Sequence, residues 1–157
     1  MKKIASILIP VLVVSLFAFT FQHEEVKVGY IYDDVELSLD HEMTASLEDF
    51  ASKYELDKVY ISDEFYGDFN FNAVGLEWYE DVPETTSSEL YIRFLTEENW
   101  SEWTELEKDI DSRGNDFNMA YSFVMTDSSE AFQYKVVMHS EDGYSTPYLA
   151  DIEFQYI

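Results

Sequence analysis

Apolar and polar residues alternate along much of this chain, and this period of two constrains its fold more than any other feature. Residues 132–138, 90–94 and 152–156 each place an apolar side chain at every second position. Successive side chains of a strand point to opposite faces, so each run has one side suited to a core and one suited to water. The sequence therefore predicts an all-β protein.

Other segments rich in β-branched or aromatic residues are bounded by Asp, Asn, Ser, Gly or Pro, which favours further short strands. They are residues 26–32, 35–39, 58–62, 70–79, 103–106 and 119–125. Short strands at this spacing predict an antiparallel, two-sheet, jelly-roll-like sandwich. One segment differs: Met43, Leu47, Phe50 and Tyr54 fall at helical spacing, which predicts a short helix near residues 41–54.

The first 21 residues have the pattern of a signal peptide. Lys2 and Lys3 precede an uncharged, mostly apolar run that ends at Phe19. The run is shorter than the roughly 20 apolar residues of a spanning helix, although a retained anchor is the alternative to cleavage. We therefore expect a signal peptide at 1–21 and a β-sandwich accessory domain at 22–157. That domain is expected to be secreted or periplasmic, in the cell envelope, with no membrane attachment after cleavage.

The chain is strongly acidic, with 33 Asp and Glu against 9 Lys and Arg and a formal net charge of −24. Nucleic acids and anionic lipids need basic residues to neutralise phosphate, so neither is an expected partner. The charge favours a solvated acidic surface. A calcium loop at residues 109–116 is the alternative, but Arg113 and Ala120 stand where ligands belong, and no metal is predicted.

The residue types that form common catalytic sites are sparse. The chain has no cysteine, and its three histidines, His23, His41 and His139, are far apart in sequence. Zinc sites and cysteine nucleophiles are therefore not expected. The glycines are isolated and no Gly-x-Ser-x-Gly motif is present. The sequence predicts no catalytic residue and no cofactor.

The most distinctive motif is Trp100-Ser101-Glu102-Trp103. Two tryptophans three apart in an extended segment point to opposite sides, so one is expected in the core and the other at the surface. An exposed indole can stack on a sugar ring, which makes Trp100, Trp103 and Trp78 the candidate ligand-binding residues. The alternative is that they fill the core. The motif is also similar to the tryptophan motif of cytokine-receptor sandwiches.

Five blocks in the second half of the chain carry a further resemblance. They are residues 71–78, 90–94, 100–106, 132–135 and 149–154. In order and spacing they resemble the β-sandwich module that precedes the catalytic domain of certain bacterial N-acetylmuramoyl-L-alanine amidases of the peptidoglycan-recognition type. In that family a signal peptide leads into the module, and a zinc amidase domain follows a linker. None of the family's zinc ligands has a counterpart here.

The resemblance implies a noncatalytic accessory module, a fragment or relative of a zinc-dependent peptidoglycan amidase. Its expected partner is cell-wall peptidoglycan or another surface glycan. The resemblance leaves two alternatives: a truncated reading frame with an amidase domain beyond residue 157, or a stand-alone relative of such modules. The alternative function is a structural or protein-interaction β-sandwich of the envelope, whose acidic face contacts a basic partner.

Overall fold

The computed structural model describes residues 26–42, 53–97, 99–108 and 118–157, and every regular element in them is a β-strand. The longer strands are β1 (Gly29–Ser38), β4 (Asp57–Ile61), β5 (Phe65–Asp81), β6 (Thr86–Thr96), β9 (Met119–Ser140) and β10 (Tyr148–Tyr156). Four strands have two residues each: β2 (His41–Glu42), β3 (Lys53–Tyr54), β7 (Asn99–Trp100) and β8 (Thr104–Glu105). The all-β prediction is confirmed.

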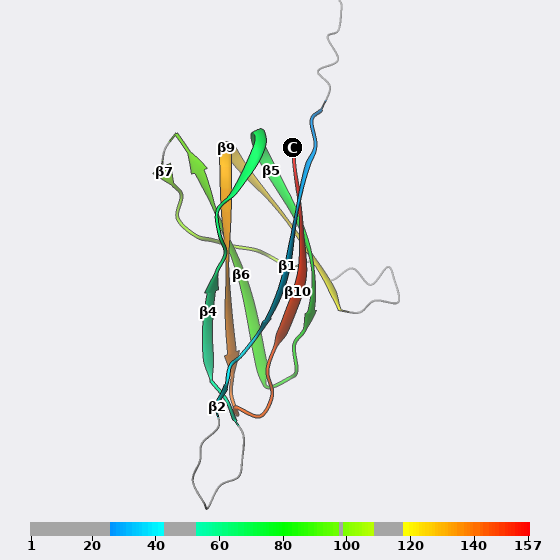
Figure 1. The fold of residues 1–157 in the computed structure, drawn as a ribbon, viewed down its shortest axis with the longest axis vertical. Coiled ribbons are helices and arrows are strands. Elements are labelled where there is room, and N and C mark those ends of the chain that lie inside the picture. Colours follow the sequence, from blue (N-terminus) through cyan, green and yellow to red (C-terminus); the bar gives the residue numbers. More distant parts are fainter. Residues whose placement is uncertain (1–25, 43–52, 98, 109–117) are drawn as a thin grey trace, which may run out of the picture.

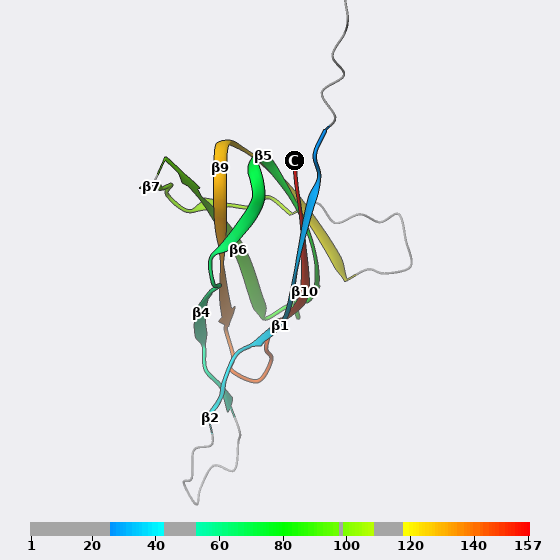
Figure 2. The same cartoon turned by 45° about the horizontal axis from the view of Figure 1, so that its top comes forward.

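Hydrogen bonds join eight of these strands into one open antiparallel sheet (Figures 1 and 2). Its order is β1-β10-β5-β9-β6-β7, with β4 also paired to β9 and β8 also paired to β6. The C-terminal strand β10 lies between β1 and β5. A separate second sheet of comparable size is not seen among the described residues, where the other sheet is only the β2–β3 pair.

Strand β9 changes partners along its length. Its residues 119–125 pair with β5, and the β5 pairing continues irregularly to residues 129, 131 and 132. Residues 131–140 pair with β6 on one side, and residues 135–139 pair with β4 on the other, beyond the end of the β5 pairing. The predicted strands at 119–125 and 132–138 are therefore one continuous strand. The predicted strands at 26–32 and 35–39 likewise merge into β1, with a register shift between Asp33 and Glu36. Such shifts bend a strand without ending it.

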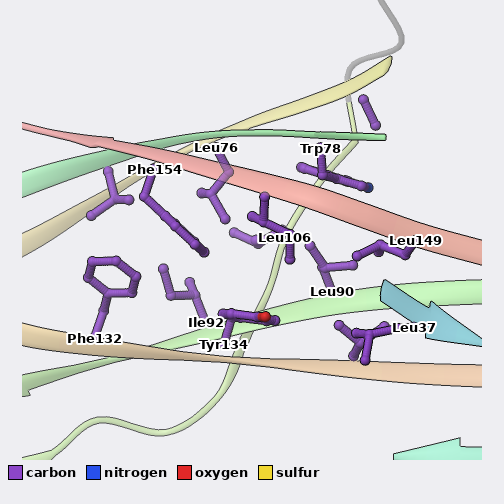
Figure 3. Packing of buried hydrophobic residues seen from close by; sticks show 14 of the residues in the cluster. Leu37, Leu76, Trp78, Leu90, Ile92, Leu106, Phe132, Tyr134, Leu149 and Phe154 are labelled. Atoms are coloured by element: carbon purple, nitrogen blue, oxygen red, sulfur yellow. The ribbon is translucent and has the colours of Figure 1, made fainter. Parts of the chain in front are cut away.

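The change of partners lets the sheet fold over and enclose a core. Figure 3 shows side chains of β5 and β10 facing those of β6 and β9. The rings of Phe132 and Phe154 meet across this core, with centroids 4.7 Å apart. The buried Tyr134 hydroxyl donates a 2.6 Å hydrogen bond to Asp33 in the irregular part of β1, so a polar contact also joins β9 to β1.

The predicted helix near residues 41–54 is not supported at its ends. Residues 41–42 and 53–54 pair as the short strands β2 and β3, and residues 43–52 lie outside the described part of the chain. The predicted signal peptide and the 109–116 loop also lie outside it. Within the described residues no helix is long and apolar enough to cross a membrane.

Candidate functional site

Trp78 lies in the core. Its ring is fully buried, and its indole N–H donates a hydrogen bond to Glu80 Oε2 at 3.0 Å. The Lys108 ammonium donates to the same carboxylate oxygen at 2.8 Å and to the Ser88 carbonyl at 2.7 Å. The buried indole N–H therefore has a hydrogen-bond acceptor. The burial of Trp78 favours the core-filling alternative for this residue, and its ring faces no solvent.

Trp100 and Trp103 lie outside the core, and both rings contact one cation. The Arg93 guanidinium carbon is 4.8 Å from the ring centroid of Trp100 and 4.6 Å from that of Trp103. The expectation that one of the two indoles enters the core is wrong, because both are only half-buried and neither belongs to the core. Residues 101–103 are not in a strand but link β7 to β8, so the alternation of a strand does not apply to them.

Strand β6 fixes the position of this tryptophan segment. The Ser101 backbone N–H donates to the Phe94 carbonyl at 2.8 Å, and the Phe94 N–H donates to Ser101 Oγ at 3.0 Å. Trp100 is opposite Leu95 in the β6–β7 pair. Since these bonds attach the segment to the strand that carries Arg93, both indoles lie beside the guanidinium.

A second cation extends the cluster. Lys135 Nζ is 4.0 Å from the ring centroid of Tyr91 and 5.1 Å from that of Trp103. Tyr91 and Lys135 are opposite each other in the β6–β9 register and point away from the core. We call this surface the tryptophan strip; it consists of Tyr91, Arg93, Trp100, Trp103 and Lys135.

The cations of the strip have unusual surroundings for so acidic a chain. Among the described residues, Arg93 and Lys135 are not within ion-pair distance of any carboxylate, whereas Lys58 and Lys108 each form an ion pair. Arg93 Nε instead donates to Gln133 Oε1 at 3.0 Å. The positive charges therefore rest against ring faces, a contact that contributes about 0.5–2 kcal/mol depending on desolvation.

The Tyr91 hydroxyl bonds to a carboxylate outside the strip. It donates a 2.6 Å hydrogen bond to Glu89, and this bond raises the pKa of Tyr91 to about 12, aided by partial desolvation and the nearby negative charge of Glu105. Sequence reasoning identified the tryptophans of the strip but missed Tyr91, Arg93 and Lys135. A usable signal was present, because all three occupy the polar positions of strands whose alternate residues are apolar.

The described residues contain no group of His, Asp and Glu arranged to hold a metal ion. His139 Nδ1 lies 2.7 Å from Asp57 Oδ1, on the exposed side of the β4–β9 pair. This pair belongs to the surface and is separate from the strip. The chemistry that the strip offers is therefore ring stacking and hydrogen-bond donation by two cations.

No protein-family model matches this chain, and no curated protein sequence matches it. The similarity to amidase accessory modules thus rests on the sequence blocks alone. The site itself consists of two indoles in contact with one guanidinium, beside an ammonium group that has no carboxylate partner in the described part of the chain.

Proposed function

We propose that this protein is a noncatalytic, exported module that binds peptidoglycan or another surface glycan through the tryptophan strip. One observation carries the proposal: the Arg93 guanidinium contacts the rings of both Trp100 and Trp103, and both rings are only half-buried. Rings that are already ordered lose little conformational entropy on binding. A preorganised aromatic surface is therefore suited to a weakly interacting ligand such as a sugar chain.

The chemistry of the strip complements a saccharide. A sugar ring has an apolar C–H face, which can stack on an indole or phenol ring, and a rim of hydroxyl groups, which accept hydrogen bonds. Lys135 contributes an ammonium group with three N–H donors, positioned beside Trp103. Wall glycans also bear carboxylates, and the two cations of the strip lower the electrostatic cost of approaching a chain with a net charge of −24.

The family resemblance supports the same assignment. In this proposal the folded-over sheet is a jelly-roll-like β-sandwich spanning residues 22–157, exported by a signal peptide at 1–21. It positions a zinc amidase, or the chain itself, at the cell wall. Support for the sandwich comes from the contact between Phe132 of β9 and Phe154 of β10, which joins opposite sides of the core.

Sedimentation with insoluble peptidoglycan tests this function. We expect the purified protein to sediment with the wall in molar salt and to release no muropeptide. The variant Trp103→Ala should weaken retention by about 1–3 kcal/mol, the range for a central aromatic anchor. Tyr66→Ala is the matched control, because it removes an exposed aromatic ring outside the strip.

Two outcomes would overturn the proposal. If the protein sediments with no wall preparation, the structural or protein-interaction alternative is favoured. If Tyr66→Ala and Trp103→Ala weaken retention equally, the contact is nonspecific and the strip is not the binding surface.

A further inference from the structure

A second surface lies on the other side of the core, on the outer face of β1, β10, β5 and the first half of β9. Directly opposite residues of antiparallel strands share a face. The register of these four strands therefore places two rows of side chains next to each other. The rows are Tyr30, Gln155, Gly75 and Phe123, and Tyr32, Glu153, Glu77 and Tyr121.

The face is hollowed where the first row reaches Gly75. A depression of about 220 Å³ is lined there by Gly75, Glu77, Tyr121, Glu153 and Gln155, together with residues 76 and 122; we call it the Gly75 groove. A Cβ atom built on Gly75 would meet only the Gln155 carbonyl oxygen, at 3.8 Å, so the space above the glycine is open. An isolated glycine in a strand often marks a place where another group approaches closely.

The groove holds two carboxylates that oppose each other. Glu77 and Glu153 are directly paired across β5 and β10. Like charges in this arrangement destabilise a sheet. No Lys, Arg or His in the described part of the chain lies within ion-pair distance of either carboxylate. A positive charge placed between them would remove their repulsion, so the charge of the groove is complementary to a cation.

The aromatic side chains indicate which kind of cation fits. Tyr121 lines the groove, and Phe123, with 62% of its surface exposed, is the cross-strand neighbour of Gly75. A ring face attracts an organic ammonium group and also covers its methylene stem. The depression is smaller than the roughly 300–1,000 Å³ of typical small-molecule pockets, so it suits one side chain.

We propose that the Gly75 groove binds the ammonium group of a lysine side chain presented by a partner polypeptide. The ammonium lies between Glu77 and Glu153, and its methylene stem lies against Tyr121. The compact, strongly hydrated ammonium of lysine can donate to both carboxylates at once. This site is on a different face from the tryptophan strip, and its existence does not depend on glycan binding by the strip.

Nuclear magnetic resonance titration of the isotope-labelled protein tests the proposal. The probe is the blocked peptide acetyl-Gly-Gly-Lys-Gly-Gly-amide, and its control is the same peptide with the lysine acetylated. We expect saturable shifts of the backbone resonances of Gly75, Glu77, Tyr121 and Glu153 with the first peptide. The acetylated peptide should shift none of them, because it lacks the charge.

Paired variants separate a built site from the net charge of the protein. Replacing both groove carboxylates, Glu77→Gln with Glu153→Gln, should weaken binding by about tenfold or more. The matched control, Glu89→Gln with Glu105→Gln, removes the same charge near the tryptophan strip and should leave the affinity nearly unchanged. Gly75→Leu should abolish binding by filling the groove without a change of charge, with an unchanged melting temperature as evidence of folding.

Three results would overturn the proposal. Equal weakening by the two carboxylate pairs would mean that net charge alone attracts the peptide. Retained binding in folded Gly75→Leu would place the contact elsewhere. Shifts of the same resonances by calcium chloride, at lower concentration than by the peptide, would assign the groove to an inorganic cation.

Discussion

The tryptophan strip and the Gly75 groove lie on opposite outer surfaces of one folded sheet, and they differ in the partners of their charged side chains. In the strip, the Arg93 guanidinium contacts two indole rings and donates a hydrogen bond to Gln133. In the groove, Glu77 and Glu153 oppose each other, with no cation at ion-pair distance in the described residues. The strip places its positive charges against aromatic rings, whereas the groove leaves two negative charges for a partner to neutralise.

This difference predicts different binding behaviour. A contact through the strip depends mainly on ring stacking and should be little affected by salt. A contact through the groove depends on carboxylates at the surface, which added ions screen. The same protein can thus bind two partners whose attachment responds differently to ionic strength.

The largest effect should come from the core between the two surfaces. Trp78 is fully buried, so Trp78→Ala should lower the free energy of unfolding by about 3–5 kcal/mol. Trp100→Ala should cost clearly less, because its ring is only half-buried, in β7 opposite Leu95 of β6. Chemical denaturation of both variants measures this. Equal losses would show that the strip belongs to the folding core.

The next largest effect should come from the cation of the strip. Arg93→Met removes two ring contacts and the hydrogen bond to Gln133, at an expected cost of about 1–2 kcal/mol. Arg93→Lys keeps the charge but loses the planar fork, so its stability should be intermediate. Tryptophan fluorescence should change in both variants as the indoles lose their shared partner. An unchanged spectrum and stability in Arg93→Met would contradict the proposed preorganisation.

Much of this architecture follows from the alternation of side chains. The runs that became β6 and β10 were predictable because each buries one face completely. The same alternation could have predicted that Trp78 is buried. Trp78 lies on the same face of the strand as the buried Val74 and Leu76, and Gly75 and Glu77 lie on the other face. Its candidacy as a ligand-binding residue came from residue type alone.

Other features depend on tertiary context that alternation does not encode. The polar residues 126–130 suggest a turn, yet β9 runs through them. Ser129 is buried there, and its hydroxyl donates to the Asp127 carbonyl at 2.8 Å, while the Thr126 and Ser129 hydroxyls are also 2.8 Å apart. These local bonds compensate for the irregular pairing, so the chain bends without leaving the sheet. The contacts of Arg93 with Trp100 and Trp103 likewise depend on the pairing of β6 with β7.

Removing one carboxylate should change the free energy of unfolding by a smaller amount, and the result should differ between the two surfaces. Glu77→Gln relieves the repulsion with Glu153 and should raise the free energy of unfolding by about 0.2–1 kcal/mol. Glu89→Gln is the matched substitution near the strip. It should not stabilise the protein, because Glu89 accepts the Tyr91 hydrogen bond. If both variants gain stability equally, the gain reflects the net charge of the chain and not the geometry of the groove.

The smallest effect concerns the proton of Tyr91. Its hydrogen bond to Glu89 raises the pKa of Tyr91 from 10.0 to about 12 in the folded protein. The folded state therefore holds this proton more tightly than the unfolded chain does. The resulting stabilisation is complete below pH 10 and is lost as the pH rises through about 12.

Carbon resonances of labelled tyrosine rings can follow the ionisation of Tyr91 separately from that of the other tyrosines. Glu89→Gln should lower the pKa of Tyr91 toward its ordinary value, whereas Glu77→Gln should leave it unchanged, because Glu77 belongs to the groove on the other face. A Tyr91 titration that responds equally to both substitutions would mean that the long-range charge of the chain, and not the contact within the strip, sets the pKa.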